Sequence, residues 1–120
     1  MENLEIQETN QTPYVLCDTN GTIKIEGRSF PTNTLHFYVP IIEWAKKFRG
    51  ETLDIHIKLD YFNTSTCKQL LAILQLFVKN HIGKKTLINW YYENDDEDAL
   101  EFGEDFEEDL EHVTFNLVEK

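Results

Sequence analysis

The chain contains few of the residues that build disulfides, redox motifs or loop-rich folds. Among its 120 residues there are two cysteines, three prolines and five glycines. Cys17 and Cys67 stand alone, without CxxC or metal-ligand spacing, so a disulfide framework and a structural zinc site are excluded. There is no N-terminal signal segment, and no apolar run approaches the roughly 18 residues of a membrane span. We therefore expect a soluble protein of the reducing cytoplasm.

Positive charge is also scarce. The sequence has 11 Lys and Arg against 22 Asp and Glu, a net charge of −11. Because such a surface repels phosphate backbones and anionic lipids, nucleic acid and membrane surfaces are excluded as partners. Twelve carboxylates and no basic residue lie between Glu93 and Glu111, whereas residues 1–92 carry nine acidic and ten basic side chains. The acidity belongs to one segment attached to a nearly neutral body.

Length and composition fit one domain with a hydrophobic core. Hydrophobic residues make up 41% of the chain and aromatic residues 12%, enough for a chain of this size to fold without covalent staples. The first residues are polar, so we expect a disordered N-terminus over 1–12. We expect a single domain over 13–120 that includes the acidic segment 93–111.

Hydrophobic periodicity predicts an α/β (α+β) domain. Alternation and turn signals predict strands over 14–18, 22–26, 52–59 and 86–92, with a further strand possible at 113–118. Helical spacing predicts helices from 33 or 34 to 49, over 68–81, and within the acidic segment. Pro40 implies a kink or two helical pieces, and a break is expected near Gly103. The order β-β-α-β-α-β-α indicates a mixed sheet of about four strands packed with helices, including a parallel βαβ crossover.

The most informative segment is the turn between the strand at 52–59 and the following helix. Three adjacent hydroxyls, Thr64, Ser65 and Thr66, lie where a buried strand ends and a helix begins, the edge at which α/β proteins place ligands and modifications. A helix N-terminus favours an added phosphate, and Lys68 adds a cation. The same residues also fit a plain helix cap without further function. The residues alone leave both interpretations open.

Several motifs resemble the SiaC-like regulatory phosphoproteins. They are Tyr61-Phe62-Asn63-Thr64-Ser65 with Lys68, Ile25-Glu26-Gly27-Arg28-Ser29-Phe30-Pro31, Phe37-Tyr38 with Pro40 and Trp44, Trp90-Tyr91-Tyr92, Asp95-Asp96-Glu97-Asp98, and Gly103-Glu104-Asp105-Phe106. The resemblance runs from about Pro13 to Val118. It implies a STAS-like fold, similar to that of anti-sigma-factor antagonists. Thr66, Cys67 and Thr32 depart from the family pattern, in which serines follow the acceptor and a Glu often follows the proline.

The resemblance also implies a function. A dedicated Ser/Thr kinase phosphorylates a Thr in the strand-to-helix turn, a PP2C-type phosphatase removes the phosphate, and the dephosphorylated form binds and activates a diguanylate cyclase that controls cyclic-di-GMP and surface attachment. Matched by motif, the acceptor is Thr64, with Ser65 and Thr66 as alternatives. The expected partner-binding residues are Arg28, Ser29, Tyr61, Phe62, Asn63, Ser65 and Lys68. For Arg28 and Ser29, positioning of the phosphoacceptor turn is a second role, and an ion pair that anchors the loop is an equal alternative.

Other chemistries find less support in the sequence. The stretch 94–98 lacks the glycine and the bidentate glutamate of a calcium loop, and His36, His56, His81 and His112 form no ligand motif, so no metal or cofactor is expected. Cys67 beside Lys68 could be a thiol of lowered pKa, but no base lies near it in sequence. We expect a non-enzyme. The competing hypotheses are a STAS-like ligand- or protein-binding module that is not phosphorylated and, third, a hydrolase or redox enzyme using Cys67.

Overall fold

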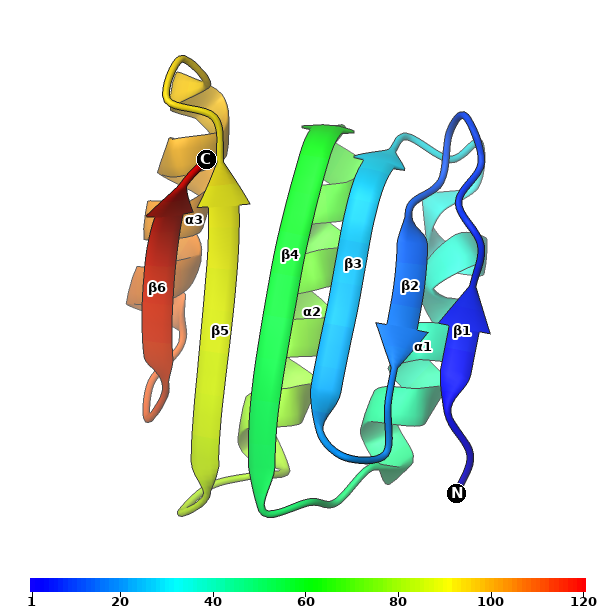
Figure 1. The fold of residues 1–120 in the computed structure, drawn as a ribbon, viewed down its shortest axis with the longest axis vertical. Helices are drawn as coiled ribbons and strands as arrows, with labels where there is room; N and C mark the ends of the chain where they lie inside the picture. The colour runs from blue at the N-terminus through cyan, green and yellow to red at the C-terminus, as the bar shows by residue number, and fades with distance from the viewer.

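A computed structural model describes all 120 residues. One sheet of six strands runs through the molecule in chain order (Figure 1). The strands are β1 (Leu4–Ile6), β2 (Tyr14–Cys17), β3 (Thr22–Ser29), β4 (Thr52–Phe62), β5 (Lys85–Tyr92) and β6 (Thr114–Glu119). The first two pairings are antiparallel, and β3 to β6 are mutually parallel. The predicted mixed sheet and the predicted βαβ crossover through β4 and β5 are confirmed.

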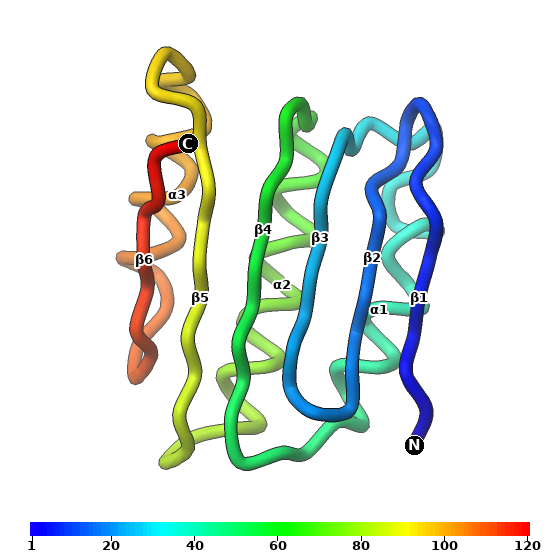
Figure 2. The backbone as a smooth tube through the Cα atoms, in the orientation of Figure 1, coloured from blue at the N-terminus to red at the C-terminus, as the bar shows by residue number.

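Three helices cover one face of this sheet. They are α1 (Thr34–Lys47), α2 (Thr64–Lys79) and α3 (Glu97–Asp109). Each helix connects two neighbouring parallel strands and lies behind the sheet in the views of Figures 1 and 2. All three helices therefore begin at the same edge of the sheet, where β3, β4 and β5 end. None of them is long and apolar enough to cross a lipid bilayer.

The core lies between the sheet and the helices. Leu53, Ile55, Ile57 and Leu59 of β4 alternate toward the helices and are at most 4% exposed. The alternate residues of β4, among them Asp54 and His56, lie on the uncovered face. Trp90 of β5 and Trp44 of α1 are both buried. Both tryptophans therefore belong to the core.

The sheet is wider than expected, because each edge gains a strand. At one edge β6 forms where the sequence left a strand possible. At the other, β1 lies within residues 1–12, which were expected to be disordered. Leu4 and Ile6 pair with Cys17 and Val15, so their apolar side chains reach the helix-covered face of the sheet. Three residues are too few to show an alternation of hydrophobic and polar side chains, so only the pairing with β2 identifies this strand.

The expected break near Gly103 and, at Pro40, the alternative of two helical pieces are wrong, because each helix is continuous. Pro40 lies inside a continuous α1 and removes one backbone donor without ending the helix. Gly103 lies inside a continuous α3, on its buried face. A Cβ at Gly103 would come within 2.6 Å of Trp90 Cδ1 and 2.7 Å of Leu117 Cδ2. This glycine therefore permits close packing of the helix on the sheet, and it is not a break.

Candidate functional site

The turn that joins β4 to α2 is capped by Asn63. The Asn63 side chain accepts a hydrogen bond from the backbone N–H of Thr66, with an N···O distance of 2.9 Å. One side-chain oxygen is enough to cap this first turn. The hydroxyls of Thr64 and Ser65 are therefore not needed to begin the helix.

The structure separates the three adjacent hydroxyls. Thr64 and Ser65 are exposed, whereas Thr66 is fully buried. The Thr66 hydroxyl donates to the backbone carbonyl of Ser29 at 3.0 Å and lies 2.7 Å from the Ser29 hydroxyl. Thr64 and Ser65 are therefore accessible from solvent, whereas Thr66 becomes accessible only if the turn opens.

Ser29 supports this turn from inside. Its side chain is fully buried, and its hydroxyl also lies 2.7 Å from the Tyr38 hydroxyl of α1. Burial raises the pKa of Tyr38 to about 12, while the hydrogen bonds to Ser29 and Thr66 act in the opposite direction. Among the roles expected for Ser29, positioning of the turn agrees with its place in the fold, because a fully buried hydroxyl cannot face a partner.

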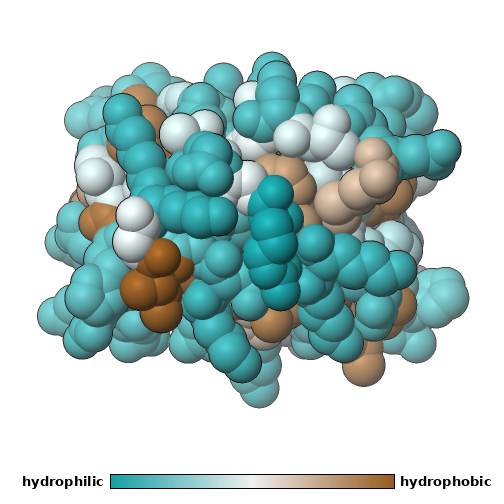
Figure 3. All heavy atoms as spheres, turned by 90° about the horizontal axis from the view of Figure 1, so that it is seen from below, coloured by the Kyte–Doolittle hydropathy of each residue, from teal (hydrophilic) through white to brown (hydrophobic).

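The remaining predicted residues form an exposed surface around the turn. Arg28 and Lys68 are exposed, and Tyr61 is 59% exposed with its ring packed edge-on against Phe30 at a centroid distance of 5.2 Å. Phe62 is half-buried and contacts Trp90 and Phe102. The structure thus brings all these residues to one edge of the sheet. The opposite end of the molecule is mostly hydrophilic, with scattered hydrophobic residues (Figure 3).

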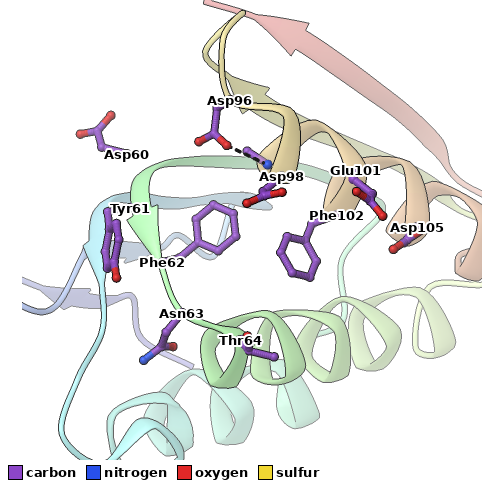
Figure 4. Close-up of a pocket in the computed structure, with 11 residues that line it drawn as sticks. Asp60, Tyr61, Phe62, Asn63, Thr64, Asp96, Asp98, Glu101, Phe102 and Asp105 are labelled. Carbon is purple, nitrogen blue, oxygen red and sulfur yellow. Dashed lines mark hydrogen bonds between the residues drawn. The ribbon is translucent and has the colours of Figure 1, made fainter.

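A groove of about 670 Å³ lies between this turn and α3 (Figure 4). Its lining residues are Asp60, Tyr61, Phe62, Asn63, Thr64, Asp96, Asp98, Ala99, Glu101, Phe102 and Asp105. Five of these eleven residues are carboxylates and none is basic. The groove therefore presents an acidic wall and an aromatic floor to any group attached to Thr64.

The acidic residues of this groove were not among the predicted site residues. Asp98, Glu101 and Asp105 are spaced three and four positions apart, which places them on one side of a helix. The sequence shows this spacing, but it does not show that this side of α3 faces the turn between β4 and α2. Asp96 instead caps α3 by accepting a hydrogen bond from the Ala99 N–H at 3.0 Å.

The other candidate chemistries gain little from the structure. No group of three or more His, Cys, Asp or Glu side chains is arranged to hold a metal. Burial raises the pKa of the Cys67 thiol to about 12, as it does for Cys17. The lowered pKa considered for Cys67 is therefore wrong, because the thiol is buried in the core. A protonated, buried thiol is a poor nucleophile.

Comparison with known proteins agrees with this geometry. The family model described as "SiaC family regulatory phosphoprotein" matches residues 6–120. An uncharacterized protein of Pseudomonas aeruginosa (strain UCBPP-PA14) is 31% identical over 114 residues, which are 91% of this chain and 90% of that protein.

Solved structures give the same relationship. In the crystal structure of the P. aeruginosa diguanylate cyclase SiaD with its activator SiaC, the similar chain has a TM-score of 0.87 and 30% identity, covering 98% of this chain and 99% of that one. Apo-SiaC from P. aeruginosa has a TM-score of 0.83 and 30% identity, covering 100% and 99%. The resemblance stated from the motifs is thus confirmed: the chain belongs to the SiaC family of regulatory phosphoproteins.

Proposed function

We propose that this chain is a partner-switching regulator in which phosphate on Thr64 controls binding to a diguanylate cyclase. The dephosphorylated form binds and activates the cyclase. A Ser/Thr kinase adds the phosphate in the cytoplasm and a PP2C-type phosphatase removes it. The chain itself catalyses no reaction in this scheme.

The observation that carries the proposal is the state of the Thr64 hydroxyl. It is exposed at the N-terminus of α2, while Asn63 performs the capping and Thr66 is held in the interior. An exposed hydroxyl that the fold does not use can be modified without unfolding the domain. Ser65 shares this exposure, and so it remains the alternative acceptor.

The electrostatics of the turn explain how one phosphate could control docking. Phosphate adds close to two negative charges at pH 7. The residues around it, Arg28, Tyr61 and Lys68, form the exposed edge that a partner would cover. Desolvating the phosphate in such an interface costs several kcal/mol, and each ~1.4 kcal/mol changes affinity about tenfold.

A binding module without phosphorylation is the second candidate. The groove beside Thr64 favours it, because a concave site with aromatic and polar lining can hold a ligand or a peptide. In that case Thr64 would be only one lining residue among eleven. Substitutions at Thr64 would then alter groove contacts without any effect of phosphate.

The two candidates can be separated with variants of Thr64. The variants Thr64→Ala and Thr64→Glu are mixed with a diguanylate cyclase from the same cells, and cyclic-di-GMP synthesis and binding are measured. The switch predicts that Thr64→Ala activates, whereas Thr64→Glu binds at least about tenfold more weakly. Equal binding by both variants would contradict control by charge at Thr64.

Thr34 provides a matched control. It is the first residue of α1 and follows the capping residue Asn33, just as Thr64 follows Asn63. Thr34→Glu therefore places the same charge at an equivalent helix position, at the same edge of the sheet. We expect it to leave cyclase binding within about threefold of the unmodified chain, a difference below ~1 kcal/mol.

A further inference from the structure

The groove beside Thr64 has an electrostatic consequence within the chain itself. Thr64 opens α2 on one side of the groove, and Asp98, Glu101 and Asp105 project from α3 on the other (Figure 4). Asp60 is paired with Lys120 at 3.2 Å, but none of these three α3 carboxylates has a cation within 4.0 Å. They present uncompensated negative charge to the position of a phosphate on Thr64.

Two opposed influences would act on that phosphate. The N-terminus of α2 and the exposed Lys68 favour it. The wall of α3 opposes it, because α3 carries acidic residues throughout and no Lys or Arg. Salt screens such repulsion over a Debye length of about 8 Å at physiological ionic strength, and it screens partly buried charges less than fully exposed ones.

The attachment of α3 shows where such repulsion would act. On the sheet side, α3 is firmly held: Trp90 Nε1 donates to the Ala99 carbonyl at 2.9 Å, and the Trp90 and Phe106 rings pack at a centroid distance of 5.1 Å. On the groove side, the contact between Phe62 and Phe102, with centroids 5.8 Å apart, bridges the turn and the helix. Figure 4 shows both rings between the two helices.

We propose that Asp98, Glu101 and Asp105 oppose a phosphate on Thr64, so that phosphorylation loosens the Phe62–Phe102 contact and separates the turn from α3. The modification then alters the docking surface itself, in addition to placing charge on it. This inference rests on Thr64 being the phosphate acceptor. In this proposal the acidic segment responds to phosphorylation of Thr64 by a change in how α3 contacts the turn.

The test compares Thr64→Glu with Thr64→Gln, which have nearly the same shape and differ in charge. Both changes are made in the full chain and in two further backgrounds. The groove background is D98N/E101Q/D105N. The control background is E104Q/E107Q/E108Q, which removes the same number of charges from exposed residues of α3 outside the groove. Urea unfolding is measured for all six proteins, together with amide hydrogen exchange over residues 98–105.

We expect the Glu variant of the full chain to unfold at a urea concentration about 0.3 M below that of the Gln variant. This difference should fall by at least half in the groove background and persist in the control background. The amides of 98–105 should exchange severalfold faster in the Glu variant. Equal midpoints for Glu and Gln in the full chain, or a difference that both backgrounds reduce equally, would overturn the inference.

Failure of this inference and failure of the proposed function give different results. If phosphate is mapped to a residue other than Thr64, the proposed acceptor fails even where the Glu–Gln difference is found. If Thr64 carries phosphate but Glu and Gln unfold alike in all backgrounds, the switch stands and the coupling to α3 fails.

Discussion

The hydroxyl oxygens of Ser29 and Thr66 lie 2.7 Å apart in the interior, although 37 positions separate them in the chain. Tyr38 extends the same network from α1. These three side chains join the end of β3, the first half of α1 and the first turn of α2 immediately behind Thr64. Thr64, the proposed acceptor, is therefore exposed on a turn that is fixed from within.

Loss of this network should destabilise the domain. Thr66→Val keeps the shape of the side chain but removes its hydroxyl, so the carbonyl and the hydroxyl of Ser29 each lose a buried partner. We expect the free energy of unfolding to fall by about 1–3 kcal/mol, measured by urea denaturation. Thr64→Val is the control, and an exposed residue should change stability by less than about 0.5 kcal/mol. Equal losses at both positions would contradict the assignment of buried and exposed hydroxyls.

Capping of α2 by Asn63 gives a second prediction. Asn63→Ala removes the oxygen that accepts from the Thr66 N–H and should cost about 1 kcal/mol, whereas Asn63→Asp should retain most of the stability. Thermal unfolding of both variants beside Thr64→Ala makes the comparison. If Thr64→Ala were the most damaging of the three, Thr64 would be the cap, and the cap-only interpretation of this residue would gain support.

Much of this site could be predicted from the sequence, because its signals are local. The alternation of 52–59 identified the central strand, and the hydroxyls after it marked the turn. The burial of Thr66 was also visible in principle, since it lies four and seven positions before Leu70 and Ile73 on the buried side of the helix. The pairing of Thr66 with Ser29 could not be predicted, because it depends on how β3 and β4 lie side by side.

The acidic segment shows which features residue spacing along the chain cannot predict. Its amphipathic spacing predicted a helix, but Gly103 was interpreted as a break. Only the position of Trp90 against α3 explains why glycine occurs there. In the same way, nothing in the sequence indicates that Asp98, Glu101 and Asp105 face Thr64. That relationship arises from the order of the parallel strands.

The packing of Gly103 is directly testable. Alanine is a better helix former than glycine by about 1 kcal/mol. Even so, Gly103→Ala should lower stability by about 1–3 kcal/mol, because the new methyl group would collide with Trp90 and Leu117. Differential scanning calorimetry measures the effect, with the exposed Glu104→Ala as control. A rise in melting temperature for Gly103→Ala would show that α3 packs less closely on the sheet than described.

The buried phenol of Tyr38 predicts a dependence of stability on alkaline pH. Its pKa is raised from 10.0 to about 12 in the folded state, so folding favours the neutral form. The stabilisation that the neutral Tyr38 phenol gives to the folded state is fully present below pH 10, and it is lost as the pH rises toward 12. At pH 11 the loss amounts to about 1.4 kcal/mol.

Tyr38→Phe should therefore lose less stability between pH 8 and pH 11 than the unmodified chain, by about that amount. Urea unfolding at the two pH values measures the difference. The buried thiols of Cys17 and Cys67 have pKa values raised to about 12 as well, so both proteins retain the part of the loss that comes from these thiols. An equal loss in the two proteins would mean that Tyr38 ionises as freely when folded as when unfolded.

Phosphopeptide mass mapping of the chain isolated from its own cells tests the central claim most directly. We predict phosphate on the peptide that spans Tyr61 to Lys68, localised to the Thr64 hydroxyl and absent from the buried Thr66. A chain that carries no phosphate in this peptide, even after incubation with ATP and the cells' own lysate, would contradict it.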